Sequence, residues 1–191
     1  MKSSSSEVIK YINFKINLHS KKTKNLKKKQ IVSICKLKNS FWPWTLKKQL
    51  EWFKKNTKKN DLNNMLIIND KLVGYTLLRK RNAYLNKKLL IYYYFDAFVI
   101  HRKFRNKGLG KVLILFNNKI IDKQKKHSFL TCSIKNIPFY LKYNWKILPK
   151  NQFKIMDHKP YWFKKNKKTL NGMTYSFNKK FKKKILYYLN D

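Results

Sequence analysis

The stretch formed by residues 96–111 constrains the fold of this chain more than any other part of its sequence. Aromatic and β-branched residues crowd the segment 89–100, which predicts one long strand. A basic turn follows, and Gly108 and Gly110 then open a segment with apolar residues at helical spacing that runs to about Lys125. The chain is therefore expected to pass from a strand through a tight turn into an amphipathic helix.

The turn between this strand and this helix predicts a site for an anion. The first N–H groups of a helix have no partner within it and attract negative charge. Gly108 and Gly110 lack the Cβ atoms that would keep phosphate oxygens away, and Arg105 and Lys107 add positive charge. A phosphate or pyrophosphate is the expected ligand. An ordinary tight turn is the alternative, because the sequence lacks the further Gly of a dinucleotide fingerprint and the Ser or Thr of a P-loop.

The remaining sequence predicts a mixture of strands and helices. Strands are expected at residues 7–18, 65–68, 72–78, 129–132, 153–156 and 173–177. Helices are expected at residues 30–37, 45–55, 138–143 and 179–189, the last of them strongly basic. Thr45 is expected to cap a helix, and Asn69 and Asp70 to form the turn of a hairpin. No repeat or linker divides the sequence, so a single domain over residues 1–191 is expected.

The lysine-rich composition gives a formal net charge of +39, from 47 Lys and Arg against 8 Asp and Glu. Such charge favours anionic partners, and nonspecific nucleic-acid affinity is one expectation. The lysines are spread along the whole chain and Gly, Pro, Ala and Arg are scarce, so coding bias in an AT-rich genome is the favoured explanation. That bias does not account for the shortage of Asp and Glu. Trp42, Trp44 and Trp52 could stack on single-stranded nucleic acid, but packing against the core is favoured.

Other classes of protein receive little support from the sequence. No run of about eighteen apolar residues predicts a membrane span, and the polar residues 1–7 do not resemble a signal peptide. Cys35 and Cys132 fall in different predicted elements and form no CxxC pair. Neither a disulfide framework nor a metal site is therefore expected, and the expected location is cytoplasmic.

The middle of the chain resembles the GCN5-related N-acetyltransferases, the GNAT family. Residues 105–110, RNKGLG, are similar to the family motif R/Q-x-x-G-x-G/A, and residues 98–100 before them to its fourth strand. Residues 132–145 resemble the fifth strand and the helix after it, and residues 65–78 resemble the second and third strands. The resemblance covers residues 33–145. It implies a mixed α/β (α+β) fold in three layers, with a twisted, mostly antiparallel central sheet of about seven strands, splayed fourth and fifth strands, and helices on both faces.

This resemblance implies an enzyme that transfers an acetyl group from acetyl-CoA to a primary amine. Backbone groups of Phe98, Val99 and Ile100 would hold the pantetheine arm as a sheet edge holds an added strand. The pyrophosphate would bind at the turn, through Arg105, Asn106, Lys107, Gly108, Leu109, Gly110 and Lys111. Tyr140 matches the family's tyrosine that protonates the departing thiolate as general acid. A core aromatic beside Phe139 is the alternative reading of Tyr140.

Asp96 is the candidate general base for the acceptor amine. Alternation along the strand places Tyr94, Asp96 and Phe98 on one face, where acids of the family that act as base often lie. Asp96 is also the only acid near the motif. A carboxylate paired with a Lys is the alternative, and His101 is expected to be a solvent-facing turn residue.

Two positions depart from the family pattern. Asn144 replaces the usual Gly before the aromatic residue, and the turn is expected to survive because Asn tolerates a left-handed conformation. Ser133 stands where many relatives carry an Asn that contacts CoA, so the side chain that makes this contact is missing.

The acceptor is expected to be a small-molecule amine that is anionic or neutral, such as a nucleotide-linked amino sugar. A cationic acceptor would need acidic residues around it, and the chain has only 8 Asp and Glu residues in total. A protein or peptide N-acetyltransferase and a non-enzymatic, basic nucleic-acid-binding module are the alternatives. The sequence leaves the oligomeric state and the length of the acyl chain open.

Overall fold

The structure is a computed structural model that describes residues 5–11, 14–156, 170–176 and 184–189. The chain divides into two compact units, one made of residues 1–79 and 95–117 and the other of residues 80–94 and 118–191. The division passes through three elements, which are β4 (Lys71–Leu85), β5 (Lys88–Ile100) and α3 (Leu109–Lys123). The single domain expected from the sequence stays a prediction.

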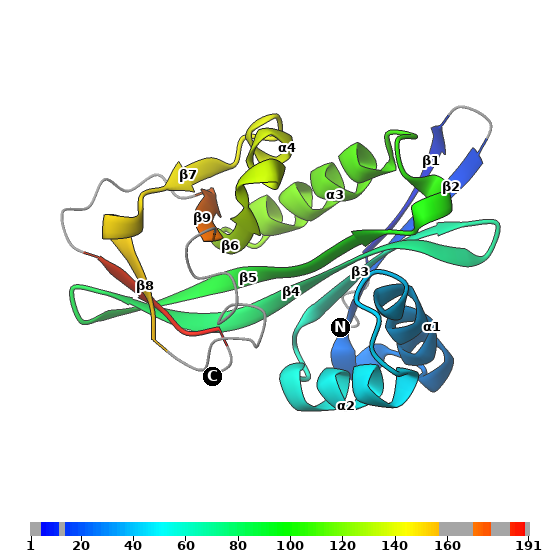
Figure 1. The fold of residues 1–191 in the computed structure, drawn as a ribbon, viewed down its shortest axis with the longest axis horizontal. Coiled ribbons are helices and arrows are strands. Elements are labelled where there is room, and N and C mark those ends of the chain that lie inside the picture. The colour runs from blue at the N-terminus through cyan, green and yellow to red at the C-terminus, as the bar shows by residue number, and fades with distance from the viewer. Residues whose placement is uncertain (1–4, 12–13, 157–169, 177–183, 190–191) are drawn as a thin grey trace. The chain divides into compact units, whose positions relative to one another are not determined.

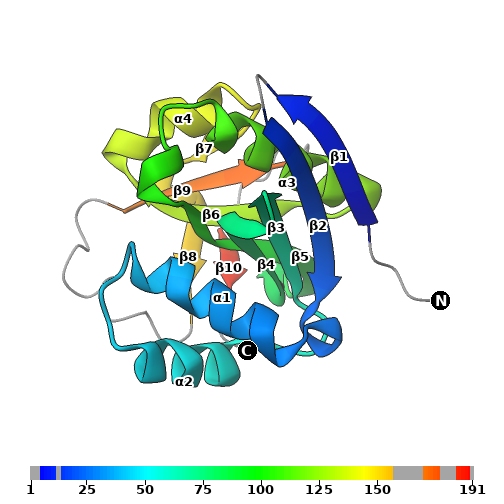
Figure 2. The same ribbon diagram turned by 90° about the vertical axis from the view of Figure 1, so that its right-hand side faces the viewer.

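An antiparallel sheet and two helices form most of the first unit (Figure 1). Its sheet contains β1 (Ser5–Tyr11), β2 (Phe14–Lys22), β3 (Leu62–Ile68) and the first part of β4 as neighbours in that order. β5 follows β4 in the strand order. Between β2 and β3 the chain forms the short 3-10 helix η1 (Thr23–Asn25), α1 (Lys28–Asn39) and α2 (Leu46–Asn56). Both ribbon views show α1 and α2 side by side (Figure 1 and Figure 2).

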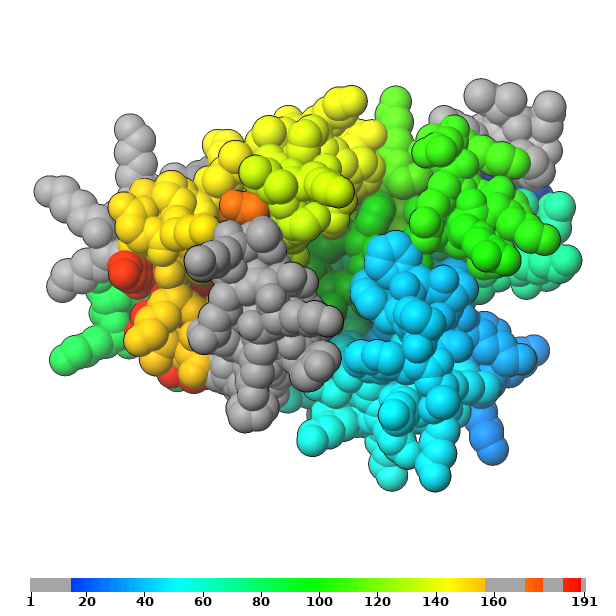
Figure 3. Space-filling view, in the orientation of Figure 1, coloured from blue at the N-terminus to red at the C-terminus, as the bar shows by residue number. Residues whose placement is uncertain are grey.

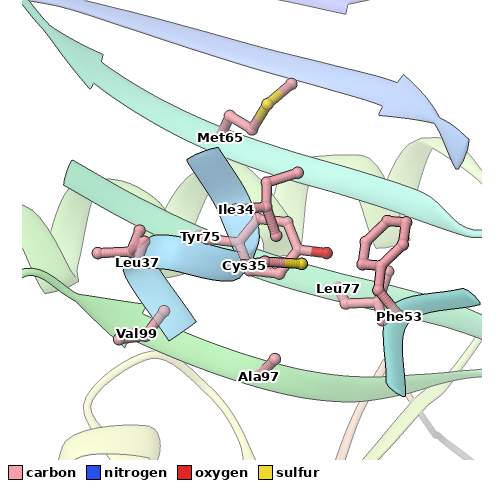
Figure 4. Packing of buried hydrophobic residues seen from close by; sticks show 9 residues of the cluster. All are labelled: Ile34, Cys35, Leu37, Phe53, Met65, Tyr75, Leu77, Ala97 and Val99. Atoms are coloured by element: carbon pink, nitrogen blue, oxygen red, sulfur yellow. The ribbon is translucent and has the colours of Figure 1, made fainter. Parts of the chain in front are cut away.

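The core of the first unit is a cluster of buried side chains from the two helices and the sheet (Figure 4). Its members are Ile34, Cys35, Leu37, Phe53, Met65, Tyr75, Leu77, Ala97 and Val99. Tyr75 donates its hydroxyl to Asn63 Oδ1 at 2.7 Å, which satisfies a phenol that is fully removed from water. Trp42 and Trp52 pack against the cluster as expected, whereas Trp44 does not and is 44% exposed.

Local signals in the sequence place the ends of several elements. Thr45 accepts a hydrogen bond from the Lys48 amide at 3.2 Å, so the predicted cap of α2 is confirmed. Asn69 and Asp70 have φ values of 47° and 59° between β3 and β4. Two left-handed residues in a two-residue loop match the twist of a hairpin, which confirms the predicted turn.

The second unit is built around a smaller set of strands. β5 and β6 (Ser128–Ser133) run parallel, and their ladder holds two residue pairs, Tyr93 with Ser128 and Tyr94 with Phe129. These are the strands that the resemblance predicted to splay. β9 (Leu170–Tyr175) lies between β6 and β7 (Lys146–Leu148) and is antiparallel to both. The short helices are η3 (Ile134–Asn136), α4 (Ile137–Leu141) and η4 (Lys150–Gln152), and the remaining strand before the tail is β8 (Phe153–Ile155).

The predicted basic helix over residues 179–189 is wrong at its end. Residues 185–187 form β10 (Ile185–Tyr187), which pairs with β8 in parallel and with β4 antiparallel, while residues 179–183 lie outside the described residues. Ile185, Tyr187 and Leu189 are all buried, and this spacing of two is that of a strand. Phe129 stacks on Tyr187 with ring centroids 4.0 Å apart, and both belong to a cluster of buried side chains that forms the core of the second unit. Burial in this cluster overrides the helical propensity of the lysines.

Two further expectations about the elements need correction. The single strand predicted over residues 7–18 is the hairpin of β1 and β2, whose register pairs Tyr11 with Phe14. The described residues contain ten strands where about seven were expected, because β1, β7 and β10 are short or weakly patterned. None of the described helices combines the length and the apolar character needed to span a membrane.

Candidate active site

A tight turn connects β5 to α3 in the first unit, as the sequence predicted. β5 ends at Ile100, the 3-10 helix η2 (Arg102–Phe104) follows, and α3 begins at Leu109. Asn106 and Gly108 have φ values of 59° and 72°. Gly108 adopts the left-handed conformation without the steric cost that a Cβ atom brings. The turn lies at the surface, since residues 101–108 are exposed or half-buried. This part of the chain is green in Figure 3.

The backbone amides at the start of α3 are available for an anion. The first bond along the helix runs from the Val112 amide to the Gly108 carbonyl at 3.3 Å. The amides of Leu109, Gly110 and Lys111 precede it, in the positions that an α-helix leaves without an intrahelical acceptor. An anion held by these amides also gains from the positive end of the helix dipole.

Arg105 is partly committed to the turn itself. Its amide donates to the Arg102 carbonyl at 3.3 Å and its Nε to the Ile100 carbonyl at 3.1 Å. The Arg105 guanidinium carbon also lies 5.1 Å from the centre of the Phe41 ring. Of the predicted phosphate contacts, the one from the Arg105 amide is therefore the least supported, because that donor already has an acceptor.

Gly74 allows β4, β5 and α3 to pack closely beneath this turn. A Cβ atom at Gly74 would lie 2.9 Å from Ile100 Cδ1, 3.1 Å from Leu66 Cβ and 3.4 Å from Leu113 Cδ2. His101, which directly follows β5, donates its amide to the Val73 carbonyl at 2.8 Å. The absence of a side chain at position 74 thus leaves room for Ile100, the last residue of β5, directly before the turn begins.

An irregular residue interrupts β5 next to the candidate base. Ala97 is buried and has a φ of 55°, a conformation that L-residues with a Cβ rarely adopt. The Phe95 and Phe98 rings stack with centroids 5.7 Å apart, although residues three apart in a regular strand face opposite sides. The expectation that alternation places Tyr94, Asp96 and Phe98 on one face is therefore wrong beyond Asp96, because the backbone leaves the extended conformation at Ala97.

Asp96 forms an ion pair, and its partner is an arginine. Arg79 Nη1 lies 3.4 Å from Asp96 Oδ2, with the two side chains 3% and 19% exposed. Lys38 lies with its Nζ 3.3 Å from the centre of the Trp52 ring, and the Arg79 guanidinium carbon lies 6.0 Å from the same ring. Cation–π attraction of this kind strengthens when the cation is removed from water.

The pKa of Lys38 is lowered from 10.5 to about 8, mainly by burial; the charges of Asp96 and Cys35 oppose this shift, and the positive charge of Arg79 adds to it. From the sequence, neither Lys38 nor Arg79 was placed at the site, and Trp52 was expected only to pack against the core. The only signal was a cation, Arg79, at the end of the otherwise apolar run in β4.

The lowered pKa of Lys38 predicts a stability that rises with pH. Below pH 8 the charged ammonium is less favourable in the folded chain than in the unfolded one, and the cost is relieved as pH rises from about 8 towards 10.5. Each unit of pKa depression corresponds to about 1.4 kcal/mol. Urea unfolding at several pH values should therefore show a rise in the free energy of unfolding that Lys38→Met lacks. Equal pH dependence in both proteins would show that Lys38 is not desolvated.

Tyr140 lies on α4 in the second unit and is 7% exposed. Burial raises the pKa of Tyr140 well above its usual value, and Cys132 and Tyr94 raise it further. The phenol is consequently protonated at neutral pH, which is the state that a general acid needs. Asn144 has a φ of 65°, so the predicted left-handed turn after this helix is confirmed.

The predicted site residues are distributed over both units. The first unit contains Asp96, the end of β5 and the turn at residues 105–111, and the second contains Tyr140. His101 is half-buried and accepts a hydrogen bond from the Lys103 amide at 3.4 Å, which gives it a role in the turn. Within the described residues, no group of three or more His, Cys, Asp or Glu is arranged to hold a metal ion.

Comparison with known proteins identifies relatives of this chain. The model of the acetyltransferase (GNAT) family matches residues 31–145. No match was found among curated proteins. Among solved structures, ElaA of Escherichia coli has a TM-score of 0.60 at 12% identity, covering 83% of this chain and 98% of its own. An acyl-CoA N-acyltransferase of Pseudomonas aeruginosa has a TM-score of 0.59 at 12% identity, and the match covers 83% of this chain and 98% of that one.

An aminoglycoside 6'-N-acetyltransferase complexed with coenzyme A is also similar to this chain. Its TM-score is 0.58 at 12% identity, and the match covers 85% of this chain and 99% of that one. At such identities the structural likeness establishes the fold alone. The predicted mixed α/β fold with a mostly antiparallel sheet is thereby confirmed.

Proposed function

The chain belongs to the acetyltransferase (GNAT) family and is an acetyl-CoA-dependent N-acetyltransferase, and we propose that it acetylates the primary amine of an anionic small molecule. A nucleotide-linked amino sugar is the kind of acceptor that fits best. The observation that carries this proposal is the charge around Asp96, where the buried cations Lys38 and Arg79 accompany a single carboxylate.

Acetyl-CoA would be held by the end of β5 and the turn after it. The amides of Leu109, Gly110 and Lys111 would bind the pyrophosphate, and Asn106, Lys107 and Gly108 would surround it. The exposed position of the turn and the left-handed Gly108 support this assignment. The backbone of Phe98, Val99 and Ile100 would pair with the pantetheine arm.

The reaction needs one proton acceptor and one proton donor. The neutral amine attacks the thioester carbonyl carbon, a C–N bond forms, and the C–S bond breaks with its electron pair on sulfur. Asp96 would take the proton that the amine loses, directly or through water, since its side chain is 19% exposed. Tyr140 would give its phenolic proton to the thiolate. The ion pair with Arg79 would hold the Asp96 carboxylate in place.

The charge distribution argues against a cationic acceptor. Asp96 is already paired with Arg79, so it offers little to a polyamine or an aminoglycoside. Asp61 is fully buried and accepts the Lys58 amide at 2.8 Å. Since a charged ligand is recognised by complementary charge, a phosphorylated acceptor suits this protein better than a cationic one.

An acceptor screen tests this proposal directly. Released CoA thiol would be measured with spermidine, kanamycin, a neutral peptide amine and a nucleotide-linked amino sugar, at low and high salt. We expect the amino sugar to give the highest kcat/KM, and we expect this value to fall as salt screens the attraction. A preference for spermidine or kanamycin would overturn the proposed acceptor. A preference for the peptide would point to protein acetylation instead.

A further inference from the structure

We propose that Asn118 is a positioning residue for Tyr140, an inference that rests on the proposed general-acid role of that tyrosine. Asn118 lies on α3 and is 6% exposed. Its Nδ2 donates to the Tyr143 carbonyl at 3.0 Å, and its Oδ1 accepts from Trp145 Nε1 at 3.1 Å. Both ends of one buried amide thus hold the turn that follows Tyr140.

The helix that carries Tyr140 needs such an attachment. α4 has 5 residues, far fewer than an isolated helix requires for stability. The amides of Tyr143 and Trp145 donate to the Tyr140 carbonyl at 3.0 Å and 3.3 Å. These bonds set the shape of the turn but do not tie it to another element. The two bonds of Asn118 tie it to α3, a helix of 15 residues.

Trp145 transmits this attachment to the Tyr140 ring. The indole is 1% exposed, and its centroid lies 5.8 Å from that of Tyr140 and 5.5 Å from that of Tyr175. Asn118 fixes the indole through its N–H, and the indole in turn packs edge-on against the phenol. A general acid must lie within hydrogen-bond reach of the atom it protonates, so a small rotation of the indole would misplace the Tyr140 hydroxyl.

Asn118→Leu removes both hydrogen bonds while keeping the number and branching of the side-chain heavy atoms. It leaves the Trp145 N–H and the Tyr143 carbonyl without their buried partner. We expect kcat to fall by about 10-fold to 100-fold, since misplacement by about 1 Å costs on the order of 10²-fold. The KM for acetyl-CoA should change by less than about 2-fold, because Asn118 is proposed to affect the chemical step and not the binding of acetyl-CoA.

A double-mutant cycle separates positioning from general structural damage. Asn118→Leu would be measured in the wild-type enzyme and in Tyr140→Phe. If Asn118 acts through the Tyr140 hydroxyl, its effect on kcat should shrink to less than about 2-fold once that hydroxyl is gone. An equal fall in both backgrounds would overturn the inference. If Asn118→Leu does not fold, Trp145→Phe enters the same cycle, because it removes the indole donor while keeping an aromatic ring.

Asn117 provides the matched control. It is the neighbouring buried Asn on α3, and it accepts from Asn64 Nδ2 at 2.7 Å and donates to the Leu113 carbonyl at 2.7 Å within the first unit. Asn117→Leu should lower the free energy of unfolding to a similar degree, with the same effect on kcat whether or not the Tyr140 hydroxyl is present. Unchanged turnover in Tyr140→Phe alone would instead refute the general-acid role itself, which is a distinguishable result.

Discussion

Replacing Gly108 with Val is expected to abolish acetyl-CoA binding in isothermal calorimetry while the protein still folds. Gly108 has a φ of 72° and directly precedes the amides at the start of α3. A branched side chain there would occupy the space that phosphate oxygens need to reach those amides. The left-handed backbone would also be strained by about 1–2 kcal/mol, a cost that a folded domain of ordinary stability survives.

The control for this strain is Asn86→Val. Asn86 has a φ of 51° in the exposed loop between β4 and β5, so valine is disfavoured there for the same backbone reason. Thermal unfolding should show comparable losses for both variants, and Asn86→Val should bind acetyl-CoA as the wild type does. Unchanged CoA affinity in Gly108→Val would mean that the pyrophosphate lies elsewhere.

Tyr140→Phe is expected to lower kcat by on the order of 10²-fold, the usual contribution of a positioned general acid. The Kd for acetyl-CoA should change little, because the hydroxyl is needed only as the thiolate leaves. The buried phenol, whose pKa burial raises, also predicts that wild-type turnover persists well above neutral pH before this group loses its proton. Single-turnover measurements with saturating acetyl-CoA would isolate the chemical step.

Tyr143→Phe is the matched control for the loss of a hydroxyl. Tyr143 is half-buried three residues further along the same turn, and its ring packs against Phe139, as the Tyr140 ring does. We expect Tyr143→Phe to keep its turnover within about 2-fold, as a residue outside the chemical step should. Wild-type kcat in Tyr140→Phe, or equal losses in the two variants, would remove Tyr140 from the mechanism.

Short-range patterns in the sequence predicted the parts of the site that depend on neighbouring residues. The strand, the turn and the helix around Gly108 were predictable because they depend on residues that are close to one another in the sequence. The left-handed Asn144 and the Thr45 cap were predictable for the same reason. Such features need no knowledge of distant segments, because backbone sterics and one local hydrogen bond decide them.

Long-range contacts decided the features that the sequence missed or misplaced. Ile185 and Tyr187 lie in a strand because β4 and β8 supply its hydrogen-bond partners. This pairing outweighs the helix propensity of the lysines that precede the strand. Ala97 leaves the extended conformation within β5, although nothing in the local sequence marks it. Tertiary packing overrides local propensity in these cases because buried apolar area and paired backbone groups outweigh a few tenths of a kcal/mol per residue, roughly the range of the propensities.

By itself, the sequence determined that this chain carries a GNAT-type strand, turn and helix, and it predicted a phosphate site at the turn, with Tyr140 and Asp96 as candidate proton donor and acceptor. Only the tertiary structure decided which partners these groups have: Arg79 for Asp96, and the Asn118 and Trp145 pair for the Tyr140 turn. The physical reason is that water satisfies a charge or an amide in the unfolded chain, so no particular partner is needed until folding buries the group. Once water is removed, each buried polar group must be satisfied by a specific neighbour, and that neighbour is set by packing across the fold.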